Sequence, residues 1–245
     1  MRRIERVRAD GIDLVGTLHE PVQTVGDVGF LFLNAGHVPR EGHAGVMARV
    51  ADRLADLGFP AWRFDLPGLG DSPGGVPVRL EDFFQRVHDG MFVEPATTLV
   101  RRLASPGGVR RIVLGGLCGG AATGIFVADR EPGAVAGLVA LEAEFSRPGE
   151  EDPRSLWGKL ASRGSWLRLL TGHSRMSSPF LVRAGRHVLG PWLLPPLTNR
   201  KLVSCYQAVV ARGIPVLVMM AAGKRRDLFI DQVDRVLFQI GRAHV

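Results

Sequence analysis

Hydrophobic residues along this chain follow two periods, and the two periods take turns from one end of the sequence to the other. Short runs that are wholly apolar or strictly alternating predict strands, whereas apolar residues recurring every three or four positions predict helices. Strands are predicted at residues 2–8, 12–18, 30–33, 61–64, 111–115, 136–141 and 215–220. Helices are predicted at residues 46–57, at 79–104 with a break near Gly90 and Pro95, at 121–129 and at 231–238.

The order of these elements predicts the fold class. Asp10-Gly11 lies between the first two alternating runs and marks the turn of a β-hairpin. The later strands and helices succeed one another, which is typical of an α/β domain with a mostly parallel sheet and helices on both faces. A length of 245 residues, of which 46% are hydrophobic, is sufficient for one such domain.

One long interval interrupts this alternation. Residues 144–205 are rich in Arg, Trp, Leu and Pro, and they are too numerous for a simple connection between core elements. We interpret them as a helical cap inserted into the domain. The predicted core therefore comprises residues 1–143 and resumes at residues 206–238.

The most informative motif is Gly-Leu-Cys-Gly-Gly at residues 116–120, between a predicted strand and a predicted helix. A nucleophile elbow needs this context, with small residues on either side of the nucleophile because the turn is tight. At the start of a helix, backbone N–H groups and the helix dipole favour a thiolate. The motif predicts Cys118 as a nucleophile for acyl transfer; the alternative is a buried structural cysteine in a glycine-rich turn.

Composition excludes several other classes of protein. The two cysteines, Cys118 and Cys205, form no disulfide framework, so we expect a reducing, cytoplasmic environment. The N-terminal residues lack the apolar segment of a signal peptide, and no run is long and apolar enough for a transmembrane helix. We expect neither a cofactor nor a metal ion.

Charge is distributed unevenly. Between residues 153 and 226 the sequence contains no Asp or Glu, although Arg and Lys recur throughout. Such a stretch suits an anionic substrate or peripheral contact with a membrane surface. It carries no nucleic-acid-binding motif and no interleaved aromatic residues, so nucleic acid is not an expected partner. The alternative is a solvated basic face that binds nothing. The sequence leaves the oligomeric state open.

Three motifs carry a resemblance to a known family. Over about residues 28–227 the order of elements and the elbow resemble the α/β-hydrolase superfamily. Residues 11–19 and the Asp-x-Pro-Gly-x-Gly-Asp-Ser turn at residues 65–72 resemble its capped, serine-aminopeptidase-like group. We expect that turn to be structural, with Asp71 hydrogen-bonding it. The Cys elbow, together with residues 155–160, is also similar to hydrolases associated with bacterial exosortase systems.

The resemblance implies a role for each site residue. Cys118 matches the nucleophile, and the N–H of Gly119 matches one oxyanion donor. The second donor comes from the loop after the third strand in this family, where His37 follows Gly36. Gly36, Arg40 and His43 are expected to line the pocket or its entrance.

The acid and the base are less well placed by the sequence. The family's acid follows its seventh strand, where Asp227 lies, and Glu142 after the sixth strand is the alternative. The base is a histidine that comes after the acid, and His244 is the only histidine beyond Asp227. No eighth strand is predicted between them.

The C-terminal residues have a further peculiarity. Residues 239–245 match the translation of a common short-read sequencing adapter. We therefore expect a non-native tail, a chain truncated near residue 238, and loss of the eighth strand, the last helix and the catalytic histidine. In that case His244 is not catalytic, and the fragment itself is inactive.

Two kinds of function remain open at this point. The first is an enzyme that hydrolyses an ester or thioester of a small molecule through an acyl-enzyme on Cys118, with acyl transfer as a variant. The second is a non-catalytic binding or accessory protein with the same fold. A cysteine in place of the usual serine is compatible with both.

Overall fold

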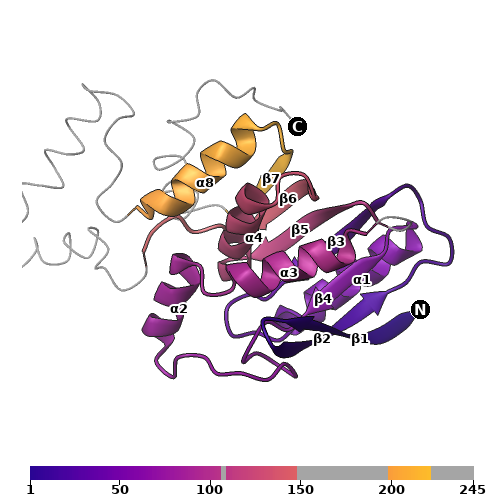
Figure 1. Cartoon of the computed structure of the whole chain (residues 1–245), viewed down its shortest axis with the longest axis horizontal. Coiled ribbons are helices and arrows are strands. Elements are labelled where there is room, and N and C mark those ends of the chain that lie inside the picture. Colours follow the sequence, from indigo (N-terminus) through magenta and orange to yellow (C-terminus); the bar gives the residue numbers. More distant parts are fainter. Residues whose placement is uncertain (106–108, 148–197, 222–245) are drawn as a thin grey trace, which may run out of the picture.

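The computed structural model describes residues 1–105, 109–147 and 198–221 (Figure 1). Within this part of the chain, seven strands form one sheet in the order β1-β2-β4-β3-β5-β6-β7. The β1–β2 and β2–β4 pairs are antiparallel and the remaining pairs are parallel. The strands are β1 (Arg2–Ala9), β2 (Ile12–His19), β3 (Val28–Leu33), β4 (Ala61–Phe64), β5 (Arg111–Leu117), β6 (Val135–Leu141) and β7 (Val216–Met219). The predicted α/β class and every predicted strand are thereby confirmed.

The hairpin turn shows how local sequence determines this arrangement. Asp10 and Gly11 both adopt positive φ angles, 49° and 81°, as the tight two-residue turns that match the twist of a hairpin require. Full pairing of Arg2 with His19 and of Ala9 with Ile12 follows. The turn therefore sets the register of β2 against β1.

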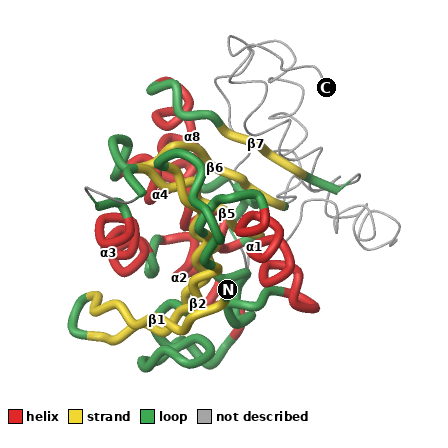
Figure 2. Tube along the Cα trace, turned by 90° about the vertical axis from the view of Figure 1, so that its right-hand side faces the viewer, coloured by secondary structure: helices red, strands yellow, loops and turns green. Residues whose placement is uncertain are grey.

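Helices cover both faces of the sheet (Figure 2). Helix α1 (Val46–Asp56) follows the short 3-10 turn η1 (His43–Gly45) and packs on one face. Helices α3 (Val93–Leu103) and α4 (Gly119–Arg130) pack on the other, where the larger hydrophobic core lies. Helix α8 (Arg200–Ala211) packs against α4 on that same side. The amphipathic pattern of α1 and the closing Gly58, with φ of 92°, agree with the prediction.

The predicted helical stretch at residues 79–104 is broken near Gly90 and Pro95, as predicted. Helix α2 (Leu80–Asp89) ends at Gly90, whose φ is 98°, and α3 begins three residues later. Pro95 itself belongs to the second helix. It lies in the first turn of α3, where a proline costs no hydrogen bond because the first N–H groups of a helix have no partner within it.

The two ends of the interval interpreted as a cap meet at the core. Ser146 forms an isolated antiparallel bridge with Thr198, and the Asn199 N–H donates to the Phe145 carbonyl at 2.7 Å. Helix α8 begins just after this junction and extends through residue 205, the predicted end of the cap. Residues 148–197 lie outside the described part, so the cap itself stays a prediction.

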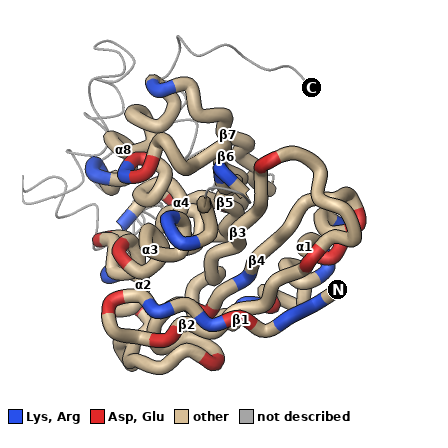
Figure 3. Tube along the Cα trace, turned by 45° about the vertical axis from the view of Figure 1, so that its right-hand side comes forward, with Lys and Arg blue, Asp and Glu red and all other residues tan. Residues whose placement is uncertain are grey.

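Acidic and basic residues are interspersed along the described part of the chain (Figure 3). Two basic residues of the acid-free stretch, Lys201 in α8 and Arg212 directly after it, bond to the core. Lys201 donates to the Asp89 carbonyl at 3.3 Å, and Arg212 pairs with Asp129. These two residues therefore anchor α8, while most of the stretch lies in residues that the structure does not describe.

Candidate active site

The turn between β5 and α4 places Cys118 at the start of the helix. Its backbone adopts φ 51° and ψ −112°, a conformation that non-glycine residues rarely adopt. The Cys118 N–H donates to the Leu141 carbonyl at 2.9 Å, and its carbonyl accepts from the Ala122 N–H at 3.1 Å. The predicted strand, sharp turn and helix are thus present, and Cys118, which is partly buried, lies between them.

The glycines around Cys118 are required by space. A Cβ atom on Gly116 would overlap the Gly120 carbonyl group, so the strand and the helix could not approach as they do. A Cβ atom on Gly120 would lie 2.7 Å from the Asn34 carbonyl oxygen and 2.8 Å from that of Leu33. The elbow is therefore packed tightly against the end of β3, and this contact fixes where Cys118 lies.

The loop after β3 reaches the same place. A Cβ atom on Gly119 would lie 3.7 Å from the Gly36 nitrogen, which shows how closely the two turns adjoin. Among the described residues, the N–H groups of His37 and Gly119 donate to no protein acceptor. Within residues 1–105, 109–147 and 198–221, two backbone donors from neighbouring turns thus have no acceptor, as oxyanion stabilisation requires.

The other residues predicted for the pocket lie in different surroundings. Gly36 is buried with a φ of 62°, and the exposed His37 stacks its ring on Phe83 of α2, with centroids 3.7 Å apart. His37 thus combines an available N–H with a side chain held against a helix. His43 is exposed in η1.

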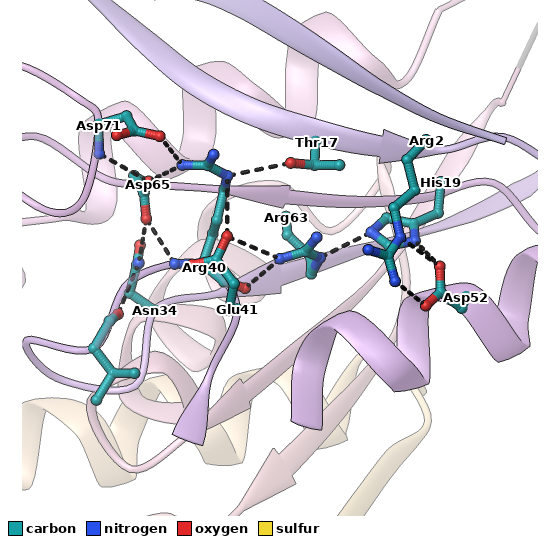
Figure 4. A network of polar contacts seen from close by, with 11 residues as sticks. Arg2, Thr17, His19, Asn34, Arg40, Glu41, Asp52, Arg63, Asp65 and Asp71 are labelled. Atoms are coloured by element: carbon teal, nitrogen blue, oxygen red, sulfur yellow. Dashed lines mark hydrogen bonds and ion pairs between the residues drawn. The ribbon is translucent and has the colours of Figure 1, made fainter. Parts of the chain in front are cut away.

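Arg40 belongs to a buried polar network that sequence reasoning missed (Figure 4). Its guanidinium pairs with Asp65 and Asp71 and donates to the Thr17 hydroxyl at 3.2 Å. Asp65, at the end of β4, is fully buried and is the centre of the 65–72 turn. Asp71 contributes to the turn as predicted, because its N–H donates to the Asp65 carboxylate at 3.1 Å. The available signal in the sequence was an acidic residue directly after a predicted strand and before a glycine-rich turn.

The network continues through Arg63 to the edge of the sheet (Figure 4). Arg63 donates to the Arg40 carbonyl at 3.0 Å and, through Nε, to His19 Nε2 at 2.9 Å. Because guanidinium can only donate, Nε2 is the acceptor, and His19 Nδ1 carries the proton that it shares with Asp52 at 2.8 Å. Burial lowers the pKa of His19, and the hydrogen bond from Arg2 lowers the pKa of Asp52 to about 2.

Glu142 is the candidate acid within the described residues. It follows β6 directly, next to the Leu141 carbonyl that binds Cys118, and its φ of 48° marks a sharp turn. Its carboxylate accepts a hydrogen bond from the Ala221 N–H beyond β7. Asp227 and His244 lie outside the described residues, as do residues 239–245, so the predictions about them stand as made.

The second cysteine differs from the first in its surroundings. Cys205 lies in the middle of α8, and burial together with Asp129 raises its pKa to about 12. A thiol of this kind is almost wholly protonated near neutral pH and is a poor nucleophile. Of the two cysteines, only Cys118 lies on a turn between a strand and a helix.

Two other features are absent from the described part of the chain. The described residues contain no group of three or more His, Cys, Asp or Glu side chains arranged to hold a metal ion. No helix within them is sufficiently long and apolar to span a bilayer.

Comparison with known proteins gives one family match. The sequence profile of the family described as serine aminopeptidase, S33, matches residues 40–186, which is more than half of the chain. Among curated protein sequences, none matches this chain.

Solved structures of similar fold include several hydrolases. A thioesterase domain from the curacin biosynthetic pathway has a TM-score of 0.56 at 14% identity, over 94% of this chain and 88% of that one. A proline iminopeptidase from Mycobacterium smegmatis has a TM-score of 0.54 at 16% identity, over 95% and 87%. DcsB in complex with its substrate analogue has a TM-score of 0.51 at 19% identity, over 69% of this chain and 55% of that one. Likeness at such low identity shows a shared fold and nothing about substrates.

Proposed function

This chain belongs to the serine aminopeptidase S33 family of α/β hydrolases, and from that membership we propose that it hydrolyses an ester or thioester with Cys118 as nucleophile. The observation that carries the proposal is the conformation of Cys118. A φ of 51° at a non-glycine residue costs about 1 to 3 kcal/mol, a strain that folded proteins retain chiefly at functional sites.

The reaction would proceed in two stages. The Cys118 thiolate attacks the acyl carbon, and the carbonyl electrons move onto oxygen to form a tetrahedral oxyanion. The N–H groups of His37 and Gly119 would donate to that oxygen. Collapse of the intermediate expels the alcoholate or thiolate, which takes up a proton. Water then attacks the thioester on Cys118, releases the acid and restores the thiol.

Stabilisation of the oxyanion would supply a large share of the rate. The two N–H groups come from turns that the fold fixes independently, one by the contact of Gly120 with the end of β3 and one by the loop after that strand. Each such donor contributes about 3 to 4 kcal/mol to the transition state. This arrangement requires no change of side-chain position during the reaction.

Two residues are candidates for the acid of the triad. Glu142 lies beside the elbow and is already oriented by the Ala221 N–H, which supports it. Asp227 fits the place of the family's acid in the sequence. Comparison of Glu142→Gln with Asp227→Asn distinguishes them, because loss of the acid lowers kcat by about 10⁴-fold in related triads.

The substrate is proposed by class. We expect a small acyl compound, and the basic residues between 153 and 226 favour an anionic one or one at a membrane surface. Reversal of Arg163 and Arg168 to Glu should raise KM for an anionic ester and leave KM for a neutral one unchanged. Equal responses to the two esters would leave the basic stretch as a solvated surface.

The central test is detection of the acyl-enzyme. The protein is purified in a form that carries the family's catalytic histidine and is mixed with p-nitrophenyl butyrate and with a butyryl thioester. Its intact mass is measured after rapid acid quench. We expect one added acyl group that maps to Cys118, release of the leaving group, and loss of both in Cys118→Ala. Cys205→Ala is the matched control and should behave as the wild type. A folded chain that binds the ester without acylation or turnover would favour the non-catalytic alternative.

A further inference from the structure

One buried carboxylate fastens both ends of the loop of residues 34–40. Asp65 Oδ1 accepts the Arg40 N–H at 2.7 Å and the Asn34 side-chain amide at 3.2 Å. Asp65 Oδ2 pairs with the Arg40 guanidinium. The loop begins at Asn34, directly after β3, and ends at Arg40, so its two ends are held by the same group (Figure 4).

The carboxylate is itself fixed by the turn that follows it. The Asp71 N–H donates to Asp65 Oδ2 at 3.1 Å, and the Ser72 hydroxyl donates to the Asp65 carbonyl at 2.6 Å. A Cβ atom on Gly70 would overlap the carboxylate, so glycine allows the backbone to close around it. Asp65 is wholly buried, and its four hydrogen bonds leave it no other orientation.

The proposed oxyanion donor lies between the two fastened ends. Within the loop, the Asn34 side-chain amide also donates to the Val38 carbonyl at 3.1 Å, and the Val38 N–H donates to the Ala35 carbonyl at 3.2 Å. These bonds turn the chain sharply at Gly36 and His37. The elbow adjoins this turn at Gly119, so a shift of either end of the loop would displace the His37 N–H from the elbow.

We propose that Asp65 is a positioning residue: through Asn34 and Arg40 it holds the His37 N–H in register with Cys118. The inference rests on the proposed function, because it assigns Asp65 a part in the oxyanion hole of that reaction. Oxyanion charge is present only in the transition state, so loosening the loop should lower kcat and leave KM nearly unchanged.

The test uses Asp65→Asn, which keeps the shape of the side chain. Its amide has one acceptor oxygen in place of two, so it cannot accept from both Asn34 and Asp71 and still pair with Arg40. We expect kcat for p-nitrophenyl butyrate to fall by about 100-fold, as small misplacements of catalytic groups do, with KM within about twofold. Amide hydrogen exchange measured by mass spectrometry should accelerate across residues 34–40.

A second reaction separates positioning from general damage. Iodoacetamide alkylates a thiolate at a saturated carbon and forms no oxyanion, so its rate at Cys118 should be unchanged in Asp65→Asn. Asp129→Asn is the matched control, since it also removes a carboxylate from an arginine, but it lies near the end of α4 and pairs with Arg212, which follows α8. Should Asp65→Asn fail to fold, Asn34→Ala releases one end of the loop alone and should lower kcat in the same direction.

The outcomes are distinct. The proposal is overturned by a folded variant with wild-type kcat, by unchanged exchange across residues 34–40, or by alkylation of Cys118 that falls in parallel with kcat. Failure of the proposed function is recognised separately, because Cys118→Ala would then turn over the ester as fast as the wild type.

Discussion

The ends of β4 and β5 lie at the same edge of the sheet and are built in opposite ways. At the end of β4, Asp65 accepts four hydrogen bonds, and the arginine that it binds is satisfied by several oxygens. At the end of β5, the backbone at Cys118 is strained, and the adjoining N–H groups of Gly119 and His37 donate to no described residue. Both turns rely on glycines, but for different purposes.

Under the proposed function, the difference separates a group that holds the fold from groups that would bind a substrate. A buried charge is tolerated only when its hydrogen-bonding capacity is filled, so Asp65 is committed to its neighbours. Donors that stabilise a charge formed only in the transition state must instead have no acceptor in the free protein, and their positions must be fixed by their surroundings. Position at a strand end therefore does not by itself identify a catalytic residue; the state of its hydrogen bonds does.

Removal of the Asp65 carboxylate, which accepts four hydrogen bonds, should cause the largest change in stability. We expect Asp65→Ala to lower the free energy of unfolding by about 3 to 5 kcal/mol, because it leaves Arg40, whose side chain is only 10% exposed, without its main partner. Urea denaturation followed by circular dichroism measures this. Asp129→Ala, which breaks the exposed pair with Arg212, should cost less than about 1 kcal/mol. Equal losses in the two variants would contradict the comparison.

The two cysteines provide the next largest contrast. At pH 7.5, iodoacetamide should label Cys118 at least about 100-fold faster than Cys205, whose raised pKa of about 12 leaves almost no thiolate. Peptide mass spectrometry at timed intervals gives both rates in one sample. Raising the pH should accelerate labelling of Cys205 progressively. Labelling of both residues at one rate would show that the elbow confers no reactivity.

Acid should weaken the polar network through His19. Its pKa is lowered in the folded chain, so below about pH 6.5 the unfolded chain takes up a proton that the folded chain does not. Stability present above that pH is therefore lost as the pH falls, by at most about 1.4 kcal/mol per pH unit. His19→Gln, which does not titrate, should have a smaller slope in urea titrations between pH 6.5 and 5.

The same experiment distinguishes His19 from two other groups whose pKa values are lowered in the folded chain. His88, buried in α2, also has a pKa lowered by burial and contributes in the same direction to both proteins. Asp52, with its pKa lowered to about 2, contributes only below about pH 4. An identical slope in wild type and His19→Gln would exclude His19 as the titrating group.

The smallest expected effect concerns strain at the elbow. Cys118→Gly should raise the free energy of unfolding by about 1 kcal/mol, because glycine adopts a φ of 51° without steric cost. Cys118→Ala keeps the strain and should leave stability nearly unchanged. The difference between the two variants in urea isolates the backbone contribution, and its absence would mean that the turn is relaxed.

Much of the fold could be predicted because its signals are local. The strands, the helix of residues 46–57 and the elbow each follow from period and turn residues within a dozen positions. The break near Gly90 and Pro95 was predictable for the same reason, because a glycine ends a helix readily and a proline is tolerated in the first turn of the next one.

The polar network was not predictable in the same way. Asp65 meets Asn34 and Arg40 through the adjacency of β3 and β4, and His19 meets Arg63 through the pairing of β2 with β4. Neither set of contacts produces a periodic pattern in the sequence. The sequence identified Cys118, Gly119 and His37 as candidates because they carry motif positions, whereas the residues that hold them are recognised only when the strands are assembled.

The bridge between Ser146 and Thr198 has a consequence for how such a protein can diversify. Because the chain leaves the sheet and returns to it at one point, the stretch between these residues can be lengthened, shortened or exchanged without pulling core strands apart. The entropic cost of closing a loop grows only slowly with its length, so such exchanges are thermodynamically mild. Selection could therefore exchange the stretch between these residues, while the proposed nucleophile and its supporting network stay constant.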